Sequence, residues 1–578
     1  MNKKEVAQVL ESIATILDLK GENPFKSRAY YNAARIVETL NEDIGQLVER
    51  GTLAELKGIG SALAEKITTL VKTGQLPYYE NLKTSVPAGL FDLLSIPGLG
   101  AKKVKAIYEK LNITTIGELE YACRENRLRE LDGFGQKSQE KILQGIELHK
   151  QYRERFLFPV AAAEAQSLLE YLQQNKQFKR LEVAGSLRRK KETIKDIDMV
   201  ASCLPKNNQI LMDYFIQFAN SQQIINQGTT KSTIVLKSGI QADLRLVTDD
   251  EFPFLLHHST GSKEHNTAMR TLAKTKNLKM NEYGLFKGNK KIACRSEEEI
   301  FRTLGLQFIP PELREDLGEI EAAQKNALPQ LYDGNPFHGI FHIHSNYSDG
   351  SNSLDEIAAY CRKKGWQYAG ICDHSKSAFY AHGLDEQRVR QQQREIDDLN
   401  SKNKTFRILK GIEADILVDG KLDFDDKTLS SFDFVIASVH SHFNMDMESM
   451  TRRICQALKN PYVTMLGHPT GRLLLGREAY PVNMEMVVKT AAQYGKIIEI
   501  NCNPFRLDLD WRYGKLAKSL SVKTALNPDA HSLEGIADYV YGIGIARKGW
   551  FETADILNSY DLQNVLKILE QIRSQKVK

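Results

Sequence analysis

Two histidines and an aspartate stand within the stretch HIHSNYSD, residues 342–349, directly after an apolar run. Imidazole nitrogens and carboxylate oxygens bind zinc, manganese and iron alike. Nine such donors are too many for one tetrahedral zinc; they suit two or three ions, which can ionise a bridging water and hydrolyse a phosphoester. The nine donors lie at or near the ends of apolar runs: His342, His344, Asp349, His374, Glu413, His440, His468, Asp529 and His531.

Three aspartates in the front half indicate a second metal site. Asp196 and Asp198 are two residues apart in a predicted strand, so their side chains share one face. A third candidate, Asp243, lies in the later strand-like stretch QADLRLV. Three carboxylates on adjacent strands suit a two-metal site that joins a nucleotide triphosphate to a 3′ hydroxyl.

A phosphate-binding group precedes this trio in the stretch GSLRRKKETIKDID, residues 185–198. Gly185 allows close approach, Ser186 offers a hydroxyl donor and Arg189 a guanidinium. A pair of aspartates alone is usually a solvated turn or strand end. The added phosphate group and the later strand aspartate favour nucleotidyl transfer.

Three short segments, LKGIG, IPGLG and LDGFG, each place Gly-x-Gly before a helix-like stretch. The backbone N–H groups at the start of the next helix can bind a phosphate oxygen. Glycine also simply ends helices, but three copies favour sequence-independent binding of the DNA backbone. The candidate DNA-binding glycines are Gly58, Gly60, Gly98, Gly100, Gly133 and Gly135.

The composition of the 578-residue chain, 42% apolar and 26% charged, indicates a globular protein of two to four domains. Residues 1–315 hold 46 Lys and Arg against 39 Asp and Glu, whereas residues 316–578 hold 32 against 34, so the front is mildly basic. No apolar run approaches the ~20 residues of a membrane span, and we expect a cytoplasmic protein without a membrane partner. The seven scattered cysteines form no CxxC pair, which fits reduced thiols.

The elements that must position these groups differ between the two halves. Residues 156–310 mix helix and strand patterns, with strands expected at RLEVAGS, DIDMVAS, STIVLKS and QADLRLV. A polar, proline-bounded stretch, 310–336, marks the main domain boundary. Seven apolar runs then recur about every 30 residues, and a helix with a capping box from Ser353 to Glu356 lies between two of them. This alternation predicts a barrel-like α/β domain whose active face is formed by the strand C-terminal ends. The runs are GIFHIH, YAGICDH, ILKGIEADI, FVIASVH, VTMLGHP, IIEINCN and TALNPDAH.

The front half resembles the family X DNA polymerases, whose best-known member is polymerase β. The likeness covers about residues 1–315 through the motifs GIGSALAEKI, GSLRRKKETIKDID, ADLRL, STGSKEHNTAMR and NEYGLF. It implies that the three aspartates are metal ligands and that Ser186 and Arg189 contact the triphosphate. It also implies that Gly261 and Asn266 lie beside the incoming nucleotide and that Arg270 contacts the template minor groove.

The same resemblance places Lys66 where such enzymes carry the lysine that attacks an abasic sugar. A neutral amine can form a Schiff base with the open-chain aldehyde and permit β-elimination. Lys26 and Tyr30 are candidate partners, whereas Ala62 stands where a supporting lysine is expected. A solvated lysine facing the DNA backbone is the alternative interpretation.

Four positions depart from the family pattern. His258 and Ser259 replace the aromatic pair that many relatives carry before TGS, which leaves sugar discrimination open, although the backbone of Gly261 could crowd a ribose 2′ hydroxyl. Lys263 stands at a position of an acid in relatives, and Gln241 replaces a basic residue near the third aspartate. We expect these changes to tune nucleotide affinity and fidelity without abolishing polymerisation.

The back half is similar to the PHP (polymerase and histidinol phosphatase) family, across roughly residues 335–578. The motifs HIHSNYSDG, ICDHS, GIEADI, VHSH, GHPTGR and NPDAH carry this likeness. It implies that all nine donors are metal ligands. His442 is then a substrate-binding or second-layer residue, Arg472 binds phosphate or solvates a loop, and Asn501 is a second-layer residue.

The expected fold is a multidomain α/β protein. It combines a helical helix-hairpin-helix N-terminal region, a polymerase β-like nucleotidyltransferase palm and a C-terminal distorted seven-stranded (β/α) TIM-like barrel. The expected domains are an N-terminal lyase-like helical domain (1–82), a helix-hairpin-helix subdomain (83–150), the palm (151–245), a nucleotide- and template-contacting subdomain (246–315), a linker (316–334) and the PHP metallohydrolase domain (335–578).

The leading hypothesis is a bacterial-type, nucleoid-associated repair polymerase, acting as a monomer. It would add dNTPs to gapped, primer–template or abasic DNA with Mg²⁺ or Mn²⁺. The PHP domain, with two or three Mn²⁺, Zn²⁺ or Fe ions, would remove 3′ nucleotides or blocking groups and incise abasic sites. Two alternatives are a fused small-molecule phosphatase of the histidinol phosphatase kind and a non-catalytic DNA scaffold.

Overall fold

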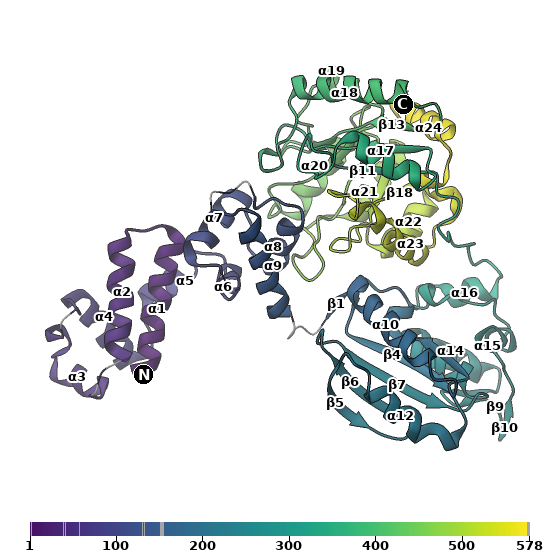
Figure 1. Cartoon of the computed structure of the whole chain (residues 1–578), viewed down its shortest axis with the longest axis horizontal. Coiled ribbons are helices and arrows are strands. Elements are labelled where there is room, and N and C mark those ends of the chain that lie inside the picture. Colours follow the sequence, from purple (N-terminus) through teal and green to yellow (C-terminus); the bar gives the residue numbers. More distant parts are fainter. Residues whose placement is uncertain are drawn as a thin grey trace. The chain divides into compact units, whose positions relative to one another are not determined.

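The computed structural model describes residues 1, 3–38, 40, 42–56, 58–96, 98–129, 131, 133–150 and 155–574. They form two compact units, Met1–His149 and Lys150–Lys578 (Figure 1). One residue of each Gly-x-Gly segment, Lys57, Pro97 or Asp132, lies outside the described residues. Within the described ranges, every helix is too short or too polar to span a bilayer.

The first unit contains helices and, in its described part, no strands. Val6, Leu10 and Ile13 recur at helical spacing on α1 and are fully buried in one apolar cluster. A second cluster gathers around Val104 and Ile107 of α7. The helices are α1 (Lys3–Lys20), α2 (Pro24–Glu38), α3 (Ile44–Arg50), α4 (Ser61–Thr73), α5 (Pro77–Lys83), α6 (Gly89–Leu94), α7 (Ala101–Leu111), α8 (Ile116–Arg124) and α9 (Gln136–Lys150).

The second unit begins with a five-stranded sheet of order β2-β4-β7-β6-β5, in which β4 and β7 run parallel and the other neighbours antiparallel (Figure 1). Buried residues of α10 and α12, such as Leu168 and Phe215, share one cluster with Ile197 and Leu244 of the sheet. The four strands expected from the sequence are confirmed as β2, β4, β6 and β7. The elements are β1 (Phe156–Leu157), α10 (Phe158–Gln173), β2 (Arg180–Val183), α11 (Gly185–Arg188), β3 (Thr193–Ile194), β4 (Asp196–Ser202), α12 (Asn208–Ile216), β5 (Ser221–Gln227), β6 (Lys231–Leu236) and β7 (Gln241–Val247).

A smaller helical subdomain follows, with a three-stranded antiparallel sheet of order β10-β9-β8. Its cluster is built around Leu285 and Phe301. The segment 316–334, expected to be a linker, contains α16, whose Ile320 and Ala323 are buried in the same cluster. The elements are α13 (Phe252–Thr260), α14 (Lys263–Thr275), β8 (Lys279–Asn281), β9 (Gly284–Lys287), β10 (Lys290–Ile292), α15 (Glu297–Thr303) and α16 (Glu319–Gln324).

The C-terminal part has two wholly parallel sheets, of orders β11-β12-β13 and β14-β15-β16-β17-β18. Parallel bridges link the sheets at Ile343–Ala530 and His374–Glu413. The strands are β11 (Gly339–Ile343), β12 (Tyr368–Ile371), β13 (Arg407–Lys410), β14 (Glu413–Asp415), β15 (Ile436–Ser438), β16 (Met465–Leu466), β17 (Ile497–Asn501) and β18 (Thr524–Asn527).

Helices surround these parallel strands (Figure 1). The capping box expected at Ser353 is confirmed: its side chain accepts the backbone N–H of Glu356, whose carboxylate accepts the N–H of Ser353. The helices are α17 (Leu354–Lys363), α18 (Glu386–Ser401), α19 (Asp426–Leu429), α20 (Met447–Leu458), α21 (Met484–Gln493), α22 (Gly514–Ser519), α23 (Tyr539–Lys548) and α24 (Leu562–Ser574).

Candidate active sites

The three predicted aspartates come together on β4 and β7. Asp196 and Asp198 lie at the start of β4, and the parallel register places Asp243 directly opposite Asp198. Burial raises the pKa of Asp198 to about 7, and the nearby Asp196 and Asp243 carboxylates act in the same direction. Carboxylates that repel one another in this way fit divalent cations, which would offset the repulsion.

Asp243 is held by three side chains from its own strand and the neighbouring one. Thr233 Oγ1 donates a hydrogen bond to Oδ1 over 2.6 Å, and Gln241 Nε2 donates to the same oxygen over 3.3 Å. Lys231 Nζ of β6 lies 2.9 Å from Oδ2. Lys231 therefore places a positive charge beside this carboxylate. The sequence analysis did not select Lys231, because the sequence of β6 does not indicate its pairing with β7.

Gly185 begins the stretch 185–198, in which Ser186 and Arg189 are the candidate phosphate-binding residues, and it packs directly against Asp198. Its φ is +62°, and a Cβ there would overlap Asp198 Oδ2, so only glycine fits. The backbone N–H of Ala184 donates to the carbonyl of Asp198 over 2.7 Å. Ser186, in the short helix α11, is therefore fixed beside the carboxylates by the backbone itself.

Arg189 follows α11 and is held at two of its three guanidinium nitrogens. Nε donates to Glu315 Oε1 over 3.2 Å, and Nη1 donates to the carbonyl of Thr260 over 2.5 Å. Nη2 makes no hydrogen bond within the described residues and is available to a phosphate oxygen. Gly261 lies against this group, since a Cβ there would come 3.1 Å from Arg189 Nη1. Two predicted site residues 72 positions apart thus meet.

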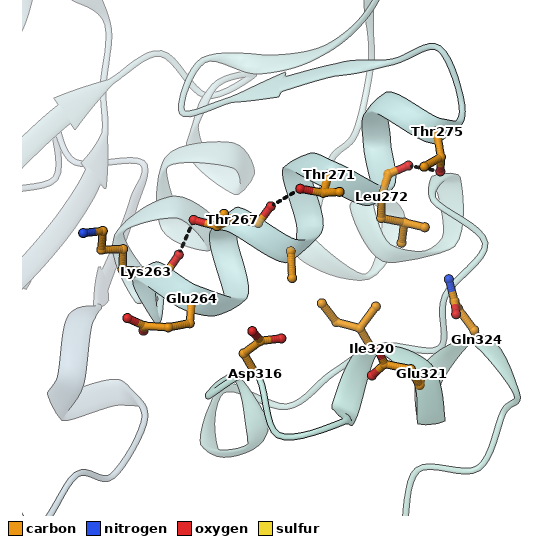
Figure 2. Close-up of a pocket in the computed structure, with 11 residues that line it drawn as sticks. Lys263, Glu264, Thr267, Thr271, Leu272, Thr275, Asp316, Ile320, Glu321 and Gln324 are labelled. Carbon is orange, nitrogen blue, oxygen red and sulfur yellow. Dashed lines mark hydrogen bonds between the residues drawn. The ribbon is translucent and has the colours of Figure 1, made fainter.

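Asn266 and Arg270 lie one turn apart on α14. Asn266 Nδ2 donates to the carbonyl of His258 over 2.7 Å, while its Oδ1 is buried and makes no hydrogen bond within the described residues. Arg270 is exposed. A groove of about 580 Å³ lies between α14 and α16 and is lined by Thr267, Thr271 and other residues, but by neither Asn266 nor Arg270 (Figure 2).

Lys66 of α4 lies over two tyrosines. Its Nζ is 5.5 Å from the ring centre of Tyr30 and 4.7 Å from that of Tyr78, and the two rings stack 6.3 Å apart. Lys26 pairs with Glu22 over 3.1 Å and lies 5.9 Å from the Tyr78 ring. Of the predicted partners, Tyr30 thus lies beside Lys66, whereas Lys26 reaches the Tyr78 ring that Lys66 also contacts.

The first glycine of each Gly-x-Gly segment takes a positive φ, +102° at Gly58, +90° at Gly98 and +83° at Gly133. This conformation favours glycine and turns the chain into the next helix. The second glycines face open space, because a Cβ there would meet nothing within 4 Å among the described residues: Gly60, Gly100 and Gly135.

Glu413, at the start of β14, is the centre of the second site. Its carboxylate is fully buried and is surrounded by nitrogens of five histidines. A carboxylate so surrounded by imidazole nitrogens would be one of the residues to hold metal ions. From Oε1 the distances are 2.9 Å to His468 Nε2, 3.1 Å to His440 Nε2 and 3.4 Å to His342 Nε2; from Oε2 they are 2.9 Å to His374 Nδ1 and 3.8 Å to His344 Nε2.

The remaining predicted ligands join the same cluster. Asp529 Oδ1 lies 3.2 Å from His344 Nε2, and Asp349 Oδ1 lies 3.4 Å from His531 Nε2. Candidate ligand atoms within 4.8 Å of one another form three overlapping groups, and with His468 they bring all nine residues together. The groups are His344, Asp349, His374 and His531; His342, His344 and Asp529; and His374, Glu413 and His440.

The backbone is strained at several of these ligands. His342, His468 and Asp529 have φ values of +57°, +21° and +53°, which side-chain-bearing residues seldom adopt. Such strain persists where the surrounding structure imposes it, often at functional sites. Here it turns the side chains at the strand ends toward Glu413.

The donor set fits metal ions. His342 Nε2, His344 Nδ1, Asp349 Oδ2 and Glu413 Oε2 are buried and make no hydrogen bond within the described residues. Burial, with the neighbouring His531 and His374, lowers the pKa of His344 to about 3, so this imidazole is neutral and able to bind a cation.

Two acidic residues orient the ligands from behind, and the sequence analysis did not select them. Glu499 Oε2 lies 2.6 Å from His342 Nδ1, and Glu499 Oε1 accepts the backbone N–H of His468. Asp415 Oδ1 lies 2.5 Å from His440 Nδ1. The two contacts at Nδ1 direct the Nε2 atoms of His342 and His440 toward Glu413. Glu499 lies 157 residues from His342, so no local motif indicates this pair.

Comparisons with known proteins match these regions. Family models match a helix-hairpin-helix domain at residues 1–76, a SAM-like helix-hairpin-helix tandem at 90–147, a DNA polymerase beta thumb at 255–315 and a PHP domain at 341–503. A Bacillus subtilis (strain 168) protein named "DNA polymerase/3'-5' exonuclease PolX" is 38% identical over 576 residues, covering 99% of this chain and 100% of that relative. The chain belongs to the PolX family.

Other similar proteins cover parts of this PolX chain. A "Probable phosphatase" from Thermoanaerobacter sp. (strain X514) is 33% identical over 193 residues, 31% of this chain and 74% of that protein. A solved structure of Leishmania infantum polymerase beta in a ternary P/T complex is 21% identical, with a TM-score of 0.27, and covers 39% of this chain and 98% of its own.

Two further predicted residues of the PolX chain lie at different depths. His442 is exposed. Arg472 is mostly buried: Nη1 donates to Asp510 Oδ2 over 2.7 Å, Nε donates to the carbonyl of Arg506 over 2.9 Å, and Nη2 donates to the carbonyl of Leu507. Through these contacts the guanidinium stabilises the loop around residues 506–510. Binding of phosphate by Arg472 stays a prediction.

Proposed function

We propose that this PolX chain adds dNTPs to the 3′ end of gapped DNA, a repair reaction in the bacterial cytoplasm. Asp196, Asp198 and Asp243 would hold Mg²⁺ or Mn²⁺, which when bound supplies a Lewis acid for nucleotidyl transfer. Ser186 and Arg189 would bind the triphosphate. The observation that carries this proposal is that three carboxylates converge beside Gly185. A side chain larger than hydrogen at this position would overlap the carboxylate of Asp198.

We further propose that the PHP domain is a 3′-5′ exonuclease that also acts on abasic sites and blocked 3′ ends. The nine clustered residues would hold two or three Mn²⁺, Zn²⁺ or Fe ions, which when bound supply an ionised water and Lewis acids for phosphoester hydrolysis. Glu413, surrounded by five histidines, supports a cluster of more than one ion. The PolX relative from Bacillus subtilis carries both activities in its name.

Primer extension and 3′ digestion by the purified protein with Mn²⁺ test both sites. Asp196→Ala/Asp198→Ala should lower extension by about 10³-fold or more and spare digestion. His342→Ala/His344→Ala should do the reverse. Loss of both activities in either variant would contradict two separate sites.

A second candidate for the PHP domain is a small-molecule phosphatase, because curated proteins named as probable phosphatases are similar to part of the chain. Their similarity covers 31% and 22% of the chain. Hydrolysis of free phosphomonoesters much faster than hydrolysis of 3′ DNA ends would favour this function.

For the N-terminal unit we propose that the Gly-x-Gly segments bind DNA phosphates and that Lys66 removes an abasic sugar. The neighbouring Tyr30 and Tyr78 support this role by partly shielding the amine from water. Borohydride should trap a covalent adduct between the protein and 5′-abasic DNA, and Lys66→Ala should abolish it. An undiminished adduct in that variant would assign the chemistry to another amine.

A further inference from the structure

Lys548, at the end of α23 in the PHP domain, contacts the stretch 185–198 that carries the candidate triphosphate-binding residues. Its side chain is fully buried. Nζ donates to the carbonyl of Arg189 over 3.0 Å, to the carbonyl of Glu312 over 3.2 Å and to Glu315 Oε1 over 2.7 Å. One lysine of the C-terminal domain therefore holds the backbone of a candidate triphosphate-binding residue.

The same lysine also fixes the side chain of Arg189, through Glu315. Glu315 Oε1 accepts from both Lys548 Nζ and Arg189 Nε. Lys191 lies 3.8 Å from Glu315 Oε2 and 5.3 Å from the ring centre of Trp511, over which Lys548 also lies at 4.4 Å. The Arg189 guanidinium is thus held by the Thr260 carbonyl and by Glu315, and Lys548 in turn holds Glu315.

A buried, charged lysine is an energetically unfavourable way to join two domains. An apolar side chain of similar length would pack there more favourably, because it needs no desolvation of a charge. Packing alone is also served by a neighbouring pair, Arg547 Nε and Glu312 Oε1, 2.7 Å apart. What distinguishes Lys548 from Arg547 is its contact with Arg189.

We propose that Lys548 is a positioning residue of the polymerase site, by which the PHP domain orients Arg189 for the triphosphate of the incoming nucleotide. This inference rests on the proposed role of Arg189. It makes the nuclease domain a structural part of nucleotide binding. Removing the Lys548 amine should weaken recognition of phosphates, whatever the base, and leave the three aspartates in place.

Gap-filling kinetics of the full-length protein test this. Lys548→Met should raise the KM for each dNTP about tenfold, with kcat and 3′ digestion within about twofold of the parent. The inhibition constant of inorganic pyrophosphate, which shares only the phosphates, should rise in parallel. Glu315→Gln, which keeps the shape but weakens the bridge, should shift both constants in the same direction. Arg547→Gln, on the same helix, should leave them unchanged.

The variant Arg189→Ala distinguishes two claims: that Arg189 binds the triphosphate, and that Lys548 positions Arg189. If Arg189→Ala raises the KM and neither Lys548→Met nor Glu315→Gln does, positioning by Lys548 is wrong while the role of Arg189 stands. If Arg189→Ala leaves the KM unchanged, the proposed role of Arg189 itself is wrong. If Lys548→Met is unstable, Glu315→Gln decides alone, and an unchanged KM and pyrophosphate constant would overturn the inference.

Discussion

At the scale of single residues, the chemistry of both sites depends on side chains that are far apart in sequence. The gathering of the nine candidate ligands could be expected because most of them lie at or near the ends of apolar runs, and parallel strands bring such ends together. Their supports were not predictable. Glu499, Asp415 and Lys231 touch ligands from other strands, and neither spacing nor a motif announces a contact of that kind.

Replacing Glu499 by glutamine should loosen the metal cluster without unfolding the domain. The carboxylate fixes His342 through Nδ1 and the backbone of His468 through its second oxygen. Loss of such a support weakens metal affinity by about 10- to 100-fold. Titration of metal ions into protein that has been stripped of them with a chelator measures this affinity directly. Glu485→Gln on the exposed face of α21 is the matched control, and equal affinities in the two variants would contradict an orienting role.

Gly185→Ala should stop polymerisation while nuclease activity persists. The new Cβ would overlap Asp198 Oδ2, so the carboxylate must move, and a displacement of about 1 Å costs about 100-fold in rate. Gly365→Ala is the control for strain alone, since its φ is +79° and a Cβ meets nothing within 4 Å among the described residues. Primer extension near parental levels in Gly185→Ala would show that the close approach is not needed.

At the scale of elements, strands with a buried face were predictable and irregular ones were not. The apolar stretches that predicted β2, β4, β6 and β7 are confirmed. β5 was missed because SQQIINQ lacks an apolar alternation and is an exposed edge strand. The single run ILKGIEADI is split into β13 and β14 at Gly411, where the Phe434 ring occupies the place of a Cβ. Only three-dimensional packing could show that break.

The helix-hairpin-helix elements should lose DNA affinity without losing stability when their second glycines are filled. Gly60→Ser and Gly100→Ser keep a residue type that caps helices well, so the free energy of unfolding should change by about 0.5 kcal/mol or less. The added side chains would face the open side of α4 and α7, where removal of each hydrogen bond to a phosphate weakens binding by about 1 kcal/mol. Binding of gapped duplexes across a salt series measures this, with Lys72→Ala at the other end of α4 as control. Unchanged affinity in the double variant would place DNA elsewhere.

At the scale of the whole molecule, the polymerase and the nuclease share more than a chain. Lys548 and Trp511 of the C-terminal part contact the segment that carries Arg189, and Arg472 lies 3.6 Å from Glu192 in the same segment. The sequence could indicate both candidate sites separately, since each has its own motif. It could not predict this contact, because a lysine at a helix end looks like a solvated residue until the fold buries it.

The buried ion pair should make nucleotide binding depend on pH. Burial lowers the pKa of Lys548 to about 8, and the positive charge of Lys191 acts in the same direction. The negative charges of Glu315 and Glu192 oppose this shift. Above about pH 8 the lysine becomes neutral and its pairing with Glu315 is lost, so the KM for dNTPs should rise. Lys548→Met, which has no proton to lose, should show a flatter profile.

The free energy of unfolding should rise over the same pH range in which nucleotide binding weakens. The weaker binding can then be told apart from a loss of folded protein. Between about pH 8 and the ordinary lysine pKa of 10.5, the unfolded chain binds a proton at Lys548 that the folded chain has released. The contribution of this group to the free energy of unfolding therefore rises with pH in that range. Parallel KM and denaturation profiles of the parent and Lys548→Met measure both. A KM that rises equally in both proteins would assign the pH dependence to another group.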